Sequence, residues 1–103
     1  MIEREKIFEL VAQELEDANR IYPLFHSPHE ACAVLKEEVE EVGYEIDWIN
    51  KMLNLMWIDV KSDVSIENNA DSIYAHAVNG IRELIQVCAM TEKIKMSNLY
   101  EEK

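Results

Sequence analysis

The residues best suited to chemistry in this sequence are acidic side chains that crowd one short stretch. They are Glu37, Glu38, Glu40, Glu41, Glu45 and Asp47. On a helix, residues three, four and seven apart share a face, so Glu38, Glu41 and Glu45 form one acidic row, with Glu37 beside Glu41. Mg²⁺ prefers oxygen ligands and commonly takes a few carboxylates together with substrate phosphates and water. The row is therefore a candidate magnesium site, and the alternative is an acidic helix face exposed to solvent.

A second polar stripe lies later in the chain, in a segment that is otherwise strongly apolar. Its members are His76, Asn79, Glu83 and Gln86, spaced by three, four and three residues. Polar groups that become buried need partners. If the two segments pack as antiparallel helices, this stripe faces Glu38 and Glu41 and makes a pocket with acids on both walls. The alternative is that the stripe is the exposed side of its helix.

Apolar periodicity divides the chain into three helical blocks, without an alternating, strand-like stretch or an internal repeat. Pro23 ends the first block, because proline lacks an N–H donor and disfavours helix at the residue before it. Ser27, Pro28 and Glu30 predict the start of the second block, with a serine cap, proline at the first helical position and a capping box. The expected helices cover about residues 3–20, 28–60 and 65–97. The sequence thus predicts an all-α fold, an antiparallel helical bundle with long second and third helices, in a single domain over 1–103.

The apolar positions of the two long blocks predict which faces pack. The second block carries Leu35, Val39, Val42, Ile46, Ile49, Leu53, Met56 and Val60, and the third carries Ala70, Ile73, Ala77, Ile81, Leu84 and Cys88. At 1.5 Å per residue the second helix is roughly 45–50 Å long, which exceeds what one small domain needs to cover itself. We therefore expect a homodimer or homotetramer. Trp48 and Trp57 have three possible roles: packing beside the apolar seam that these positions form, packing in a subunit interface, or stacking on a base.

Composition limits the partners. The 103 residues include 21 acidic and 10 basic side chains, a net charge of −11, and 49% of the residues are hydrophobic. Binding to polymeric nucleic acid works through Lys and Arg, so this balance argues against it. A phosphorylated ligand can still bind if divalent cations lie between the two. No signal peptide or stretch of about 20 apolar residues is present, so we expect no membrane partner and a cytoplasmic location.

Three stretches together resemble the all-α nucleoside triphosphate pyrophosphohydrolases of the MazG type. They are Phe25-His26-Ser27-Pro28-His29-Glu30-Ala31, Val34-Leu35-Lys36-Glu37-Glu38-Val39-Glu40-Glu41 and Arg82-Glu83-Leu84-Ile85-Gln86-Val87-Cys88-Ala89-Met90. The family pattern is Glu-Glu-x-x-Glu on one helix and Glu-x-x-Asp on a later one. Glu37, Glu38 and Glu41 match the first half. Glu83 matches the second half, and Gln86 stands where the family usually has Asp.

The resemblance implies a Mg²⁺-dependent enzyme that hydrolyses a nucleoside or deoxynucleoside triphosphate to the monophosphate and pyrophosphate. Metal ligands would be Glu37, Glu38, Glu41 and Glu83, with Glu38 and Glu41 expected to be essential for catalysis. The substrate would contact Gln86, Asn79, Lys36 and Lys93.

Two alternatives to this enzyme remain at the level of sequence. The first is a non-catalytic helical interaction protein that keeps the same fold, and the neutral Gln86 favours it. The second is a carboxylate-bridged di-metal oxidoreductase, a class that needs Glu-x-x-His pairs. None of the three histidines supplies such a pair, so we rank this class last.

Overall fold

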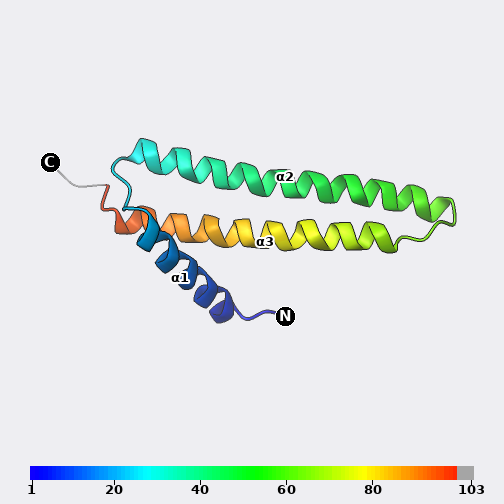
Figure 1. The fold of residues 1–103 in the computed structure, drawn as a ribbon, viewed down its shortest axis with the longest axis horizontal. Coiled ribbons are helices and arrows are strands. Elements are labelled where there is room, and N and C mark those ends of the chain that lie inside the picture. Colours follow the sequence, from blue (N-terminus) through cyan, green and yellow to red (C-terminus); the bar gives the residue numbers. More distant parts are fainter. Residues whose placement is uncertain (100–103) are drawn as a thin grey trace.

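The computed structural model describes residues 1–99 and contains three helices there: α1 (Arg4–Ile21), α2 (Pro28–Lys61) and α3 (Glu67–Met96) (Figure 1). The predicted all-α class and the long second and third helices are confirmed. The helix boundaries agree with the expected ones to within two residues. Within the same part of the chain, no helix combines the length and the apolarity needed to cross a membrane.

The start of α2 follows the signals in the sequence with one difference. Tyr22 leaves α1 in an extended conformation before Pro23, at φ −123° and ψ 144°. Ser27 caps α2, because its Oγ accepts a hydrogen bond from the Glu30 N–H at 3.1 Å. Glu30 does not return the bond to Ser27 as a capping box would. Its carboxylate accepts from the His26 N–H at 3.4 Å instead, so the loop one residue earlier is tied to the helix.

Backbone hydrogen bonds, and not a side-chain cap, determine where α2 ends. The Val64 N–H donates to the Asp59 carbonyl at 2.9 Å and the Asp63 N–H donates to the Val60 carbonyl at 3.3 Å. This pair of bonds is the Schellman arrangement, which requires a left-handed residue after the helix. Asp63 takes that conformation at φ 56°, and aspartate is among the residues that tolerate it. The chain therefore reverses within a few residues and α3 returns along α2.

The two long helices lie antiparallel and side by side, and α1 packs obliquely against α3 near its carboxyl end (Figure 1). The molecule measures 66 × 27 × 22 Å, and its radius of gyration is 18.1 Å. A compact chain of this length has a radius near 13 Å, so the hairpin is long and thinly covered. The buried core lies where all three helices meet and consists of Val11, Phe25, Ala31, Ala89 and Met90.

The expected packing seam is only half correct. On α2, Leu35, Val42, Ile49 and Met56 are partly buried, whereas the alternate positions Val39, Ile46, Leu53 and Val60 are exposed. We call these four exposed residues the outer stripe. On α3, Ile73 and Ala77 are partly buried, but Ala70, Ile81, Leu84 and Cys88 are exposed. The physical reason is that α1 packs on α3, so α2 has one neighbouring helix and can cover only one side of a two-sided stripe.

Candidate metal centre

Three carboxylates from two helices meet where α2 and α3 pack together. Glu38 and Glu41 come from α2, where they are three residues apart and share a face, and Glu83 comes from α3. One carboxylate oxygen from each lies within 4.8 Å of the other two. Glu38 and Glu83 are partly buried and Glu41 is at the exposed rim. The antiparallel hairpin therefore brings together acids that are more than forty residues apart in the chain.

The environment of this trio disfavours negative charge. Burial raises the pKa of Glu83 from its ordinary 4.5 to about 7, and the neighbouring carboxylates Glu41 and Glu38 add to the rise. Burial also raises the pKa of Glu38, and repulsion from Glu41 and Glu37 adds to it. Without a counter-charge, the site therefore holds a proton near neutral pH.

Two oxygens of the trio have unmet bonding capacity. Glu38 Oε2 and Glu83 Oε2 are both buried, and neither receives a hydrogen bond from the part of the chain that the structure describes. A buried polar atom without a partner is costly and is therefore rare in folded proteins. A proton shared between the carboxylates removes part of that cost, and a bound cation removes more, because it pairs with all three groups at once.

Oxygen-only donors match a hard divalent cation. Mg²⁺ binds one or two protein carboxylates together with water and phosphate oxygens, whereas zinc sites usually include His or Cys. The trio offers three carboxylates, with no His or Cys in the group. Its chemistry therefore fits Mg²⁺ or another hard cation better than Zn²⁺.

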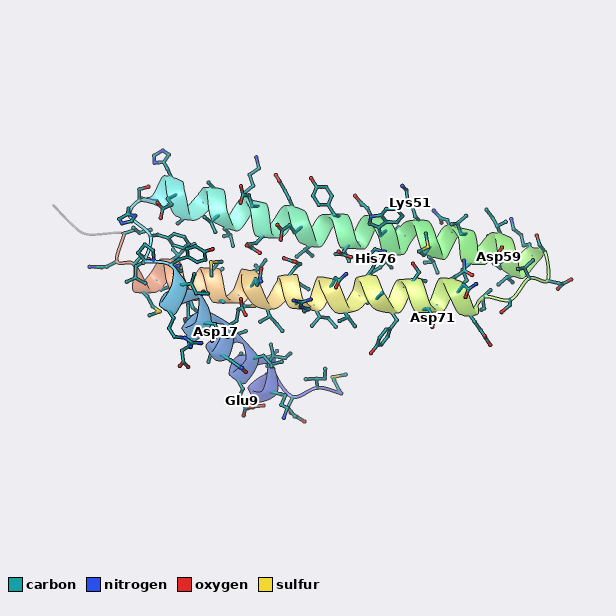
Figure 2. The ribbon with its side chains drawn as sticks, viewed as in Figure 1. Glu9, Asp17, Lys51, Asp59, Asp71 and His76 are labelled. Carbon is teal, nitrogen blue, oxygen red and sulfur yellow. The ribbon has the colours of Figure 1, made fainter. Side chains whose placement is uncertain are left out.

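The third member of the predicted acidic row has a different partner. Glu45 Oε2 lies 2.6 Å from His76 Nδ1 in a partly buried pair between α2 and α3. The His76 ring stacks on Trp48 at 5.5 Å between centroids and 5° between planes, and Lys51 Nζ lies 4.9 Å from the Trp48 ring. Figure 2 shows His76 directed from α3 toward α2, beneath Lys51. Glu45 therefore cross-links the hairpin next to the trio and does not belong to it.

A cavity of about 500 Å³ adjoins the trio at the end where α1 meets the hairpin. Its apolar and aromatic lining includes Ala18, Tyr22, Phe25, Val34 and Met90. Its polar lining includes Glu14, Glu30, Glu37, Glu38, Gln86 and Lys93. Glu38 belongs both to the trio and to this wall, so the cation site lies next to the cavity.

The other predicted site residues fall into two groups. Glu37 and Gln86 line the cavity, and Glu37 lies outside the carboxylate trio. Lys93 lines it too and is only 3% exposed. Asn79 is exposed and does not line the cavity. Lys36 is exposed as well, and its Nζ is 3.9 Å from Glu40 on the outer side of α2.

Several features of the site were not foreseen from the sequence. Glu14 and Tyr22 reach the cavity from α1 and its end, and nothing in their spacing marks them. The pairing of Glu45 with His76 could have been predicted from the sequence, since Glu45 belongs to the acidic row and His76 to the second polar stripe. The burial of Lys93 was not predicted, because a lysine close to Glu92 and Lys95 is typical of a surface.

Comparison of the chain with protein-family models, with curated proteins and with solved structures finds no match.

Proposed function

We propose that this protein is a Mg²⁺-dependent nucleoside triphosphate pyrophosphohydrolase of the MazG type. Water would be added across the anhydride between the α- and β-phosphorus atoms, to give the nucleoside monophosphate and pyrophosphate. The observation that carries this proposal is the carboxylate trio Glu38, Glu41 and Glu83, with two buried oxygens that lack a partner. A nucleotide is a substrate that brings phosphate oxygens to such a cation and an organic group to the adjoining cavity.

The trio residues would hold the cation, and Glu37 would raise the negative potential beside it. When bound, Mg²⁺ neutralises the polyphosphate and stabilises the charge that develops on the leaving pyrophosphate. Glu83 has to lose its proton for this role. Because its pKa is about 7, cation binding below pH 7 is expected to release a proton, so the affinity should rise as the pH rises to about 7 and level off above it.

Gln86 lies on the same face of α3 as Glu83, one turn further on, and lines the cavity. It would orient water or substrate through its amide, in place of the carboxylate that the family usually has there. Of the two predicted lysine contacts, Lys93 is in the cavity and Lys36 is not. We therefore keep Lys93 as a substrate contact, and we withdraw Lys36 and the exposed Asn79 from the proposed site.

The test is pyrophosphate release from a panel of ribo- and deoxyribonucleoside triphosphates, with and without Mg²⁺. Glu38→Gln and Glu41→Gln should abolish turnover, because each removes a charge from the trio while it keeps the side-chain shape. Glu40→Gln is the matched control, since Glu40 neighbours Glu41 but points to the outer side of α2. Turnover that survives both trio substitutions would refute the proposed site.

A non-catalytic interaction protein is the second candidate, and the outer stripe favours it. This candidate predicts no turnover on any nucleotide and no thermal shift with Mg²⁺. The proposed enzyme predicts turnover and a thermal shift with Mg²⁺, so one set of assays separates the two candidates.

We propose further that the chain works as a homodimer or homotetramer. Within residues 1–99 only five apolar residues are buried, while the outer stripe and both tryptophans, Trp48 and Trp57, are exposed on the hairpin. A second copy that packs along the outer stripe would complete a helical bundle and cover this surface. Analytical ultracentrifugation tests this, and a monomer at micromolar concentration would contradict it. A cytoplasmic location also stays a prediction.

A further inference from the structure

Lys93 is the one charged side chain, among residues 1–99, that is buried in this fold, with 3% of its surface exposed. Its Nζ lies 5.0 Å from the centre of the Phe25 ring and 6.0 Å from that of Tyr22. Contacts of this kind stabilise a cation but leave its three N–H donors unused. In the described chain, no carboxylate pairs with this ammonium group and no oxygen accepts from it. The Nζ atom itself is not fully enclosed, so its three donors are open to an acceptor from outside the chain.

The cavity supplies the place for that acceptor, since Lys93 is part of its wall. On α3, Glu83, Gln86, Met90 and Lys93 follow one another at intervals of three, four and three residues, so they share one face. Lys93 is ten residues beyond Glu83, about 15 Å along the helix axis. A group bound at Lys93 is therefore at the far end of any molecule whose phosphates lie at the carboxylate trio.

The charges around the cavity indicate that the part of the bound molecule next to Lys93 is neutral. Besides Glu37 and Glu38 near the trio, Glu14 and Glu30 share the cavity wall with Lys93, so carboxylates outnumber the one ammonium group. A free anion would meet net repulsion there. A neutral, planar group with a carbonyl oxygen meets none, and it can pack against the exposed ring of Tyr22 while its oxygen accepts from Nζ.

We propose that this cavity binds the nucleobase of the substrate, and that Lys93 Nζ donates a hydrogen bond to a carbonyl oxygen of the base ring. This inference rests on the proposed function for the identity of the ligand as a nucleotide. Lysine only donates, so the site favours bases that carry a ring carbonyl, namely uracil, thymine, cytosine and guanine. Adenine has no carbonyl group and should bind poorly.

The test uses nucleosides, which have no phosphate and need no metal. The full chain, in EDTA, is titrated with thymidine and with deoxyadenosine while backbone amide shifts are followed by NMR. Phe25 is the reporter, because its N–H donates to Ser97 Oγ at 2.9 Å at the edge of the cavity. We expect thymidine to shift this amide and to bind about ten-fold more tightly than deoxyadenosine, the range of one hydrogen bond to a charged group.

Lys93→Met is the decisive variant, because methionine keeps an unbranched apolar chain and removes the ammonium group, with its charge and its donors. It should lose about ten-fold in thymidine affinity and leave deoxyadenosine unchanged. Lys95→Met is the matched control, since Lys95 is two residues away on the same helix but is exposed and paired with Glu92 at 3.1 Å. A thermal melt of each variant verifies that it is folded, and Lys93→Arg, which keeps a donor, should retain the preference for thymidine.

Failure of this inference can be told from failure of the proposed function. Equal binding of both nucleosides by the natural chain, or unchanged thymidine binding by Lys93→Met, overturns the role of Lys93 even if nucleotides are hydrolysed. Thymidine binding that depends on Lys93 supports the cavity as a base site even if no triphosphate is turned over.

Discussion

Replacing Glu83 with glutamine should remove a pH dependence of stability that the carboxylate trio creates. In the folded chain burial and the neighbouring acids raise the pKa of Glu83 to about 7, against 4.5 when the residue is free of these effects. Below pH 4.5 this carboxyl group is protonated in both the folded and the unfolded chain. Between 4.5 and 7 only the folded chain keeps the proton, so the free energy of unfolding falls as the pH rises.

The size of the effect follows from the shift. A rise from 4.5 to about 7 corresponds to about 3 kcal/mol, and solvent at the partly exposed trio reduces this to about 2 to 3 kcal/mol. Glu83→Gln stays neutral at every pH and can donate to the carboxylates of Glu38 and Glu41. Its free energy of unfolding should therefore change by about 2 to 3 kcal/mol less than that of the natural chain between pH 5 and pH 8.

Urea denaturation in EDTA, followed by far-ultraviolet circular dichroism at one fixed protein concentration, measures this difference. Glu40→Gln removes the same charge from an exposed position on the outer side of α2, and its pH profile should parallel that of the natural chain. Added Mg²⁺ at pH 8 should restore stability to the natural chain and restore less to Glu83→Gln. Parallel pH profiles of the natural chain and Glu83→Gln would refute the reasoning, because the buried carboxyl group would then carry no excess cost.

Further substitutions test the rest of the molecule. Glu41→Gln should lower Mg²⁺-dependent pyrophosphate release at least about 100-fold, because mutating even the residues that orient a metal ligand lowers activity about 10- to 100-fold. Near-normal release would exclude Glu41 from the site. Gln86→Asp adds a charge beside the trio and should tighten Mg²⁺ binding about ten-fold by calorimetry; weaker or equal binding would mean that position 86 does not face the ion. Leu53→Glu puts a charge in the outer stripe and should shift sedimentation toward the monomer, whereas an unchanged species would exclude the stripe from the interface. Phe25→Ala should lower the free energy of unfolding by about 3 kcal/mol because Phe25 is buried in the core, and a loss below about 1 kcal/mol in urea would contradict that placement.

Local signals in the sequence were enough to define the helices. Pro23 ends α1 and Ser27 caps α2, and both act through backbone geometry and hydrogen bonds within a few residues. The same holds for the acidic row, because helical spacing alone places Glu38 and Glu41 on one face. Even the approach of Glu83 followed from one added assumption, that the two long helices are antiparallel.

Burial, in contrast, was decided only by the tertiary structure. The apolar positions of α2 form a stripe with two sides, and the sequence does not say which side meets α3, the one helix that packs on α2 among the described residues. Leu53 is therefore exposed although it has the same periodicity as its half-buried neighbours. Lys93, in contrast, is buried although lysine is usually a surface residue. Short-range periodicity determines which residues share a helix face, but only the packing of three helices determines which of those faces lose contact with water. The raised pKa of Glu83 and the burial of the Lys93 side chain both follow from that loss.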